Sequence, residues 1–257
     1  MDLEGKVAIV IGASRGCGKY FALALSRAGA AVVVAARSDS PGPLPGTIHE
    51  TAEMIREGGG KVLAIRCDAA VPGDLQRLVG ETVFRFGRLD VLVNNAANAT
   101  RMPFFNITPE WWDGYFHVNV RGPFLAAQAS APHMSQQGGG SIINITSGAA
   151  TAPSNDTTMQ HHGMYAITKA ALDRVTTWLA QEIRPYNIAV NSLSPGPTIT
   201  EGILDRLPAD RREASGLDWL PASVELLGPS IVHLAKSDAN AITGRVLSVD
   251  GFGKTWP

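Results

Sequence analysis

The 257 residues carry 22 Lys and Arg against 23 Asp and Glu, so the formal net charge is −1. With no run of basic residues, the chain is not expected to bind nucleic acid or an anionic membrane surface. Hydrophobic residues make up 45% and charged residues 18% of the chain, which are ordinary values for a globular protein long enough to bury a sizeable core.

Cysteine content and the first residues bear on the cellular compartment. The two cysteines, Cys17 and Cys67, are too few for a disulfide framework or a metal knuckle. Residues 1–4 are acidic where a secretory signal would be basic, and the apolar runs are too short to span a bilayer. We therefore expect a cytoplasmic protein that does not associate with membranes.

A strand, a glycine-rich turn and a helix are predicted at the start of the chain. Residues 6–11 form an apolar, β-branched run typical of a buried parallel strand, and 19–29 have a helical pattern. Between them, Gly12, Gly16 and Gly18 follow the spacing GxxxGxG. Glycines let a backbone approach a pyrophosphate, and a helix N-terminus offers N–H groups to it. The pattern indicates a dinucleotide-binding turn, with a plain tight turn as the alternative.

The second predicted strand, 31–36, bears on the choice of cofactor because it ends at Arg37, 19 residues after Gly18. In NAD-binding proteins an acidic residue about 20 positions on binds the ribose 2′-hydroxyl. A guanidinium instead suits a 2′-phosphate by its charge and its fork of donors. Arg15, inside the glycine turn, is a second candidate. We predict NADP(H) rather than NAD(H), although either arginine could be a solvated surface side chain.

The next two strands also end in residues suited to a ligand. Strand 62–65 is followed by Asp68, which could accept a hydrogen bond from an adenine amine or cap a turn. Strand 89–93 runs into 94–97, whose amides and small side chains permit close approach of a ligand. A Pro- and Gly-rich loop at 38–46 precedes the third strand, and helices are predicted at 47–57 and 72–86.

A long helix is predicted to start at Thr108, with Pro109 in the first helical position, and to continue to Met134. Trp111 and Trp112 are interpreted as packing or subunit-contact residues. Asn119 stands among apolar neighbours, and a buried Asn must find hydrogen-bond partners. It is therefore either structural or part of a site.

A possible acid–base pair follows the fifth predicted strand, 141–146, which ends at Ser147. Tyr165 and Lys169 are four residues apart on a helix predicted to run to about Arg184, so they share one helical face. An ammonium beside a phenol favours the phenolate and is expected to lower the Tyr165 pKa toward neutrality, where a general acid or base works best.

The remaining pattern completes an α/β fold. Strands are predicted at 188–193 and 245–250, with a helix at 221–235 and a possible substrate lid at about 198–221. Strands alternate with helices, and no linker or repeat divides residues 1–257. We predict a single-domain, Rossmann-like, doubly wound fold with a mostly parallel seven-stranded sheet flanked by helices.

These motifs together resemble the short-chain dehydrogenase/reductases from end to end. The turn 12–18 resembles the family's TGxxxGxG, with Ile11 in place of Thr, and 94–97 resembles its NNAG, with Ala97 in place of Gly. Segment 195–200 resembles PGxxxT, and Asn119, Ser147, Tyr165 and Lys169 match the family's four catalytic residues. The resemblance implies cofactor contacts by Gly12, Ser14, Arg15, Gly16, Cys17, Gly18, Arg37, Asp68, Ala69, Asn95, Ala96, Ala97, Tyr165, Lys169, Pro195, Gly196, Thr198 and Thr200.

The resemblance also implies a mechanism without a metal. Tyr165 exchanges a proton with the substrate oxygen, and Ser147 holds and polarises the carbonyl. Lys169 depresses the Tyr165 pKa and bonds the nicotinamide ribose, while Asn119 orders a water that links Lys169 to solvent. The cofactor carries the hydride. The family also implies a homo-oligomer, a tetramer or dimer, formed through the Asn119 and Tyr165 helices and the C-terminal strand.

Several alternatives remain open from the sequence. The same machinery could use NAD(H), or an enoyl or imine substrate, or the chain could be a cofactor-binding scaffold without catalysis. The loop 148–164 is long for the family, and its Asn155, Asp156, His161 and His162 either contact a polar substrate or are surface padding. A metal site at the two adjacent histidines lacks a convincing third ligand. The substrate itself is not predicted beyond a small alcohol/carbonyl pair.

Overall fold

The computed structural model of the chain describes residues 2–42, 44–152, 161–196, 198 and 220–257. Within that part of the chain, no helix combines the length and apolar character needed to cross a membrane. Seven strands form one sheet in the order β3-β2-β1-β4-β5-β6-β7, and every neighbouring pair is parallel. The predicted fold class is confirmed.

The strands of the sheet centre are buried on both faces, which explains why they read as continuous apolar runs. The strands are β1 (Val7–Ile11), β2 (Ala31–Ala36), β3 (Val62–Arg66), β4 (Val91–Asn94), β5 (Gly140–Ile145), β6 (Ile188–Ser194) and β7 (Val246–Ser248). The main helices are α1 (Gly16–Arg27), α2 (Ile48–Glu57), α3 (Pro72–Phe86), α4 (Pro109–Phe116), α5 (Gly122–Gln136), α6 (Gly163–Glu182) and α9 (Leu220–Lys236).

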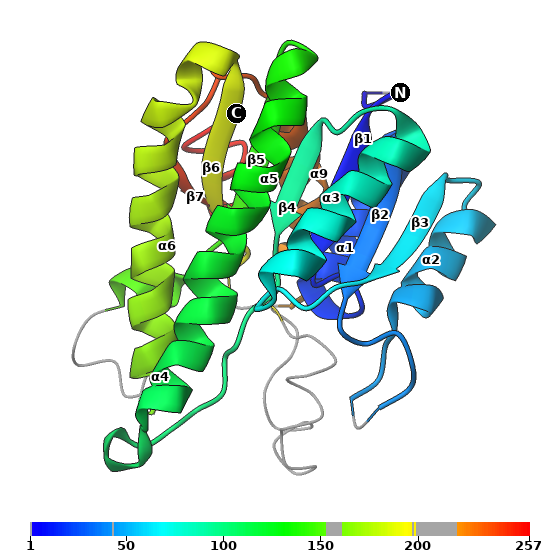
Figure 1. The fold of residues 1–257 in the computed structure, drawn as a ribbon. Helices are drawn as coiled ribbons and strands as arrows, with labels where there is room; N and C mark the ends of the chain where they lie inside the picture. The colour runs from blue at the N-terminus through cyan, green and yellow to red at the C-terminus, as the bar shows by residue number, and fades with distance from the viewer. Residues whose placement is uncertain (1, 43, 153–160, 197, 199–219) are drawn as a thin grey trace.

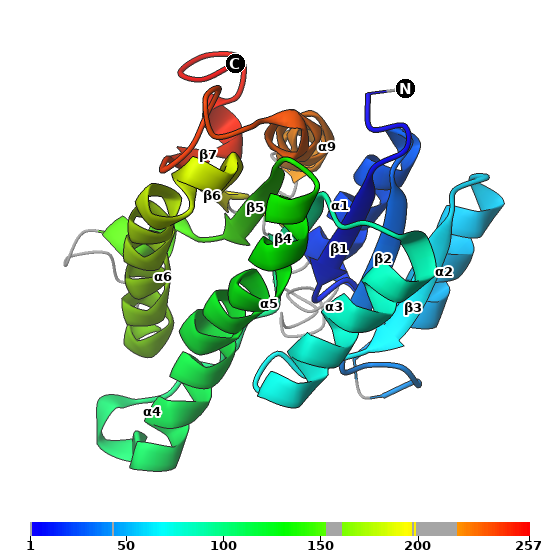
Figure 2. The same cartoon turned by 45° about the horizontal axis from the view of Figure 1, so that its top comes forward.

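The helices form two layers, one on each face of the sheet (Figures 1 and 2). On one face, α1, α2 and α9 enclose a core that includes Phe21, Ile55 and Leu234. On the other face, α3, α5 and α6 pack over a second core that includes Leu78 and Met134. Short 3-10 turns lie at Phe104–Asn106, Gly148–Thr151, Arg184–Tyr186 and Val249–Gly251.

Three predicted elements differ from the observed ones. The first helix begins at Gly16, inside the predicted turn, because the glycines allow a tight reversal of the chain. The last strand ends at Ser248 rather than at 250, since its partner β6 ends at Ser194 and offers no further backbone groups. The helix predicted from Thr108 to Met134 is interrupted by a π-helical turn at His117–Arg121, although Thr108 caps it as expected.

Two predicted loops fall largely outside the described residues. The proposed lid at 198–221 is described only at 198, 220 and 221, and the loop before Tyr165 is not described between 153 and 160. Asn155, Asp156 and Thr200 therefore lie outside the described residues.

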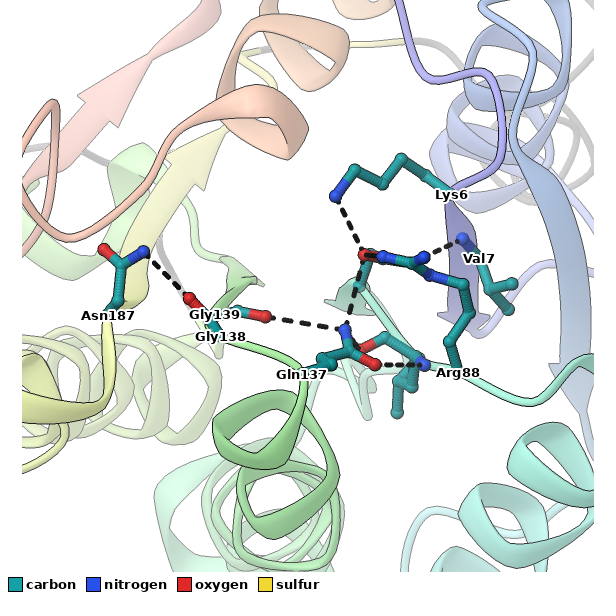
Figure 3. A network of polar contacts seen from close by, with 9 residues as sticks. Lys6, Val7, Arg88, Gln137, Gly138, Gly139 and Asn187 are labelled. Carbon is teal, nitrogen blue, oxygen red and sulfur yellow. Dashed lines mark hydrogen bonds and ion pairs between the residues drawn. The ribbon is translucent and has the colours of Figure 1, made fainter.

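A buried carboxylate ties the amino ends of the central strands together (Figure 3). The Asp90 side chain, 6% exposed, accepts hydrogen bonds from Lys6 Nζ (3.0 Å), Arg88 Nη2 (2.7 Å) and the Val7 amide (2.9 Å). Gln137, just after α5, donates to the same carboxylate at 3.3 Å. Burial alone would raise the pKa of the Asp90 carboxyl, but these donors outweigh it and hold the pKa below its usual range.

We predict that Asp90→Asn lowers the free energy of unfolding by about 2 kcal/mol, because charge-assisted bonds are lost but Lys6 and Arg88 remain half-exposed. A carboxylate whose pKa is lowered by folding contributes its full stabilisation above the pKa that it has in the unfolded chain, about 4. This stabilisation is lost as the pH falls through the lower pKa of the folded state. Urea unfolding at several pH values should show the gap between wild type and variant shrinking below about pH 4.

A matched control is Glu53→Gln, which removes the exposed Glu53–Arg56 pair on α2. This change should alter stability by less than about 0.5 kcal/mol, since exposed pairs contribute little. An equal loss in both variants would contradict a special role for Asp90.

Candidate active site

A cleft of about 670 Å³ opens at the carboxyl ends of the strands. It lies where the strand order reverses, with β1 between β2 and β4, the place at which doubly wound sheets bind ligands. The glycine turn, Arg37 and Asp68 line one part of the cleft, and Tyr165 and Lys169 line another. The fold therefore brings together residues that are more than 100 positions apart.

The glycine turn is packed too closely for a side chain at position 12 or 18. Gly12 has φ +86°, and a Cβ on it would lie 2.6 Å from the Ala96 amide nitrogen. A Cβ on Gly18 would lie 2.1 Å from the carbonyl oxygen of Gly12. The Asn95 side chain holds this approach by donating to the same carbonyl at 2.8 Å. The result is a bare backbone cradle at the start of α1, as a pyrophosphate requires.

Two arginines line the cleft near the end of β2. Arg37 is exposed beyond the end of β2 and lines the cleft with Arg15, which donates to Ser38 Oγ at 2.7 Å and to the Gly46 carbonyl at 3.1 Å. Asp39, the nearest acid in sequence, is paired with Arg66 at 3.5 Å. The charge at this end is suited to an anionic group such as a phosphate.

Asp68 caps a turn, one of the two roles that the sequence left open, and it also lines the cleft. It lines the cleft beside Ala69, and its Oδ1 also accepts a hydrogen bond from the Ala70 amide at 2.9 Å. The Asp68 amide donates to Asp74 Oδ2 at 2.9 Å, which fixes the turn into α3. A carboxylate anchored in this way is held at a constant place on the cleft wall.

Asn119 lies in the π-helical turn and is fully buried. Its Oδ1 accepts from the Asn98 amide at 2.7 Å, and its Nδ2 donates to the Asn98 carbonyl and to Thr168 Oγ1, both at 2.9 Å. Thr168 in turn donates to the Tyr165 carbonyl at 2.9 Å. Asn119 thus joins the segment after β4 to the helix that carries Tyr165. A π-turn often marks a functional position.

Lys169 is 2% exposed and its Nζ donates to the Ile145 carbonyl at 2.6 Å. Burial lowers its pKa to about 8, and the nearby Asp173 carboxylate opposes that effect. The ammonium lies 5.5 Å from the centre of the Tyr165 ring. A buried lysine with such a pKa can hold or release a proton near neutral pH.

The expected lowering of the Tyr165 pKa by Lys169 is wrong for the chain as it stands. Burial raises the Tyr165 pKa, a hydrogen bond from the Ser147 side chain opposes the rise, and the negative charge of a Cys17 thiolate would raise it further. The physical reason is that Lys169 donates its short hydrogen bond to a backbone carbonyl and is itself partly neutralised by burial. Desolvation of the phenolate therefore exceeds the attraction of the lysine.

Ser147 stands at the end of β5, where its Oγ accepts from the Ala149 amide at 3.2 Å and starts a 3-10 turn. The Ser147 side chain also acts on the Tyr165 phenol, because it opposes the rise of the Tyr165 pKa. Pro195 also lines the cleft, Gly196 has φ +73°, and the buried Thr198 donates to the Pro195 carbonyl at 3.1 Å. Among the described residues, no group of three or more His, Cys, Asp or Glu side chains is arranged to hold a metal.

Sequence reasoning placed Asn98 in the wall of the substrate pocket but missed its bonds to Asn119, and it missed Thr168 and Asp173 altogether. Thr168 and Asn98 link Asn119 to its surroundings, and Asp173 lies one helical turn after Lys169. The helical spacing from Lys169 to Asp173 was a usable signal for the last of these. The contacts of Asn98 and Thr168 with Asn119 depend on the π-turn, which no pattern in the sequence predicts.

Comparison with known proteins agrees with this arrangement. Residues 6–208 match the family model for short chain dehydrogenase. The chain is 38% identical to an uncharacterized oxidoreductase of Methylorubrum extorquens, covering 97% of this chain and 98% of that protein, and 35% identical to L-xylulose reductase of Caenorhabditis elegans, covering 97% and 96%. It superposes with a TM-score of 0.82 and 28% identity on a 7α-hydroxysteroid dehydrogenase solved with NADH and 7-oxo glycochenodeoxycholic acid, covering 97% and 94%. The chain therefore belongs to the short-chain dehydrogenase/reductase family of oxidoreductases.

Proposed function

We propose that the protein transfers a hydride between NADP(H) and an alcohol/carbonyl substrate. The observation that carries the proposal is the Tyr165 phenol, which lines the cleft beside the glycine turn with the buried Lys169 ammonium 5.5 Å from its ring centre. Family membership supports a nicotinamide cofactor, which supplies or accepts the hydride when bound.

The cleft fits such a dinucleotide by a feature of its own. A Cβ on Gly12 or Gly18 would collide with the backbone of Ala96 or of Gly12, so glycine is needed for the tight turn that brings the start of α1 to the cleft. Backbone N–H groups at a helix start suit a pyrophosphate. By family resemblance, Asp68 would hold the adenine and Lys169 the nicotinamide ribose. Asn95, Ala96, Ala97, Pro195, Gly196 and Thr198 would line the path between them.

Tyr165 is the proposed proton donor in the reducing direction. Because burial raises its pKa, the phenol is protonated at neutral pH and has a proton to give to the substrate oxygen. Ser147 would hold that oxygen and polarise the carbonyl. Lys169, with a pKa of about 8, can then return a proton toward Tyr165 through the water that Asn119 is proposed to order. The oxidising direction reverses each transfer.

The preference for NADP(H) rests on Arg37 and Arg15. Both line the cleft, and the nearby Asp39 is already paired with Arg66. NAD(H) remains the alternative, because the similar 7α-hydroxysteroid dehydrogenase was solved with NADH. An enoyl or imine substrate, or a non-catalytic scaffold, would use the same cleft.

Tyr165→Phe is expected to lower kcat by about 100-fold or more, because a positioned general acid contributes that much. Thermal stabilisation by NADPH should stay unchanged, since the cradle is intact. The assay uses L-xylulose and 7-oxo glycochenodeoxycholic acid, the carbonyl compounds in the names of two similar proteins, with NADPH. Tyr20→Phe, which alters a tyrosine on α1 outside the cleft, is the control and should keep full activity. Near-normal turnover of Tyr165→Phe would refute the proposal.

Arg37→Leu is expected to raise the KM for NADPH about tenfold or more and to leave the KM for NADH unchanged, because a charge-assisted contact to the 2′-phosphate is lost. Arg27→Leu, at the end of α1 remote from the turn, should change neither KM. Equal effects on both cofactors would show that Arg37 does not select between them.

We also propose that two copies associate through the face formed by α5 and α6. This face has a groove of about 480 Å³, in which Phe124 stacks on Trp178, whose exposed fraction is 42%. Sedimentation should show an oligomer for wild type and a smaller species for Trp178→Glu. Phe84→Glu, at a 93% exposed position on α3, should not alter the assembly. A monomeric wild type would contradict the proposal.

A further inference from the structure

His162 lies against the proposed catalytic tyrosine and has no part in the mechanism above. It is the last residue before α6, three positions ahead of Tyr165. The centres of the imidazole and phenol rings are 4.6 Å apart, and their planes differ by 11°. Rings in this arrangement attract each other beyond the effect of the area they bury.

The backbone around His162 is held on both sides. The preceding residue, His161, has φ +61°, a left-handed conformation that is uncommon for a residue other than glycine. Its carbonyl accepts a hydrogen bond from the Met102 amide at 2.9 Å, which ties the start of α6 to the segment after β4. The His162 carbonyl accepts from the Ala166 amide at 3.1 Å as the helix begins. The imidazole is therefore placed by a fixed backbone and is not carried on a free loop.

This contact restricts the Tyr165 side chain. Two torsions direct a phenol, and both are limited when the ring is stacked on His162 and has the Lys169 ammonium 5.5 Å from its centre. The hydroxyl is then kept near Ser147, whose side chain acts on the Tyr165 pKa and where the substrate oxygen is proposed to sit. Proton transfer is sensitive to such alignment, because a displacement of about 1 Å can cost a large factor in rate.

We propose that His162 is a positioning residue, which holds the Tyr165 phenol in line for proton transfer through ring stacking and not through its own titration. The proposal rests on the proposed role of Tyr165. It predicts that an aromatic ring is needed at position 162, and that a polar residue without a ring does not replace it.

The first test compares His162→Ala, His162→Gln and His162→Phe. The probe is NADPH with whichever of L-xylulose and 7-oxo glycochenodeoxycholic acid the wild type reduces. Loss of the ring in Ala or Gln should lower kcat about threefold to tenfold, with the KM for NADPH unchanged, as the size of stacking effects implies. The solvent deuterium isotope effect on kcat should rise, because proton transfer becomes slower. His162→Phe should restore kcat to within about twofold of wild type. His49→Ala, at an exposed position on α2, is the control.

The second test needs no substrate. The phenol of Tyr165 is titrated by ultraviolet difference absorbance of each variant against the same variant carrying Tyr165→Phe. Burial raises the wild-type pKa, so removing the ring in His162→Ala should admit water and lower the pKa toward about 10. His162→Phe should titrate like wild type. Cys17, Ser147 and Lys169, which also affect or adjoin this phenol, are unchanged in every variant.

Two results would overturn the inference: wild-type kcat and wild-type titration in His162→Ala, or rescue of kcat by Gln but not by Phe. The second result would mean that the polar edge of the imidazole acts, and not its ring. If Tyr165→Phe is inactive while His162→Ala behaves as wild type, only the positioning role fails. If Tyr165→Phe stays active, the proposed function fails independently of the titration result.

Discussion

Parallel pairing of all seven strands is the constraint on which the remaining structure depends. It places every carboxyl end at one edge of the sheet, so the loops that follow β1, β2, β4 and β5 meet there. The close approach of Gly12 to the Ala96 backbone follows directly, since these residues leave adjacent strands at the same level. A side chain on Gly12 or Gly18 would separate β1 from β4 just where the cleft opens.

The amino ends and the carboxyl ends of the strands form two edges of the sheet with different roles. At the amino edge, the Asp90 carboxylate accepts hydrogen bonds from the Val7 amide and from Arg88, and its pKa is held below the usual range. At the carboxyl edge, Lys169 is buried with a lowered pKa, and Tyr165 is buried with a raised one. Burial therefore disfavours both the Lys169 ammonium and the Tyr165 phenolate. Stability is therefore supplied at one edge, which leaves the other free to hold groups in states suited to proton transfer.

Much of the fold was predictable because buried parallel strands read as unbroken apolar runs, as 31–36 does, and because Thr108 and Pro109 form a recognisable helix start. The π-turn at Asn119 was not, since one extra residue per turn leaves no mark on hydrophobic spacing. The end of β7 was also missed, because strand length there is set by the partner and not by the residues themselves.

The Tyr165–Lys169 pair likewise combines a feature that the sequence predicts with one that tertiary contacts determine. Helical spacing correctly brought the lysine to the phenol, 5.5 Å from the ring centre. The spacing did not predict which oxygen atom the Lys169 ammonium would hydrogen-bond, nor how much water the helix and the sheet would exclude from the pair. Desolvation of a buried phenolate can shift a pKa by several units, whereas a lysine that is itself partly neutralised offers less opposing attraction. Proximity in sequence thus fixes which groups meet, and burial decides which of them keeps the proton.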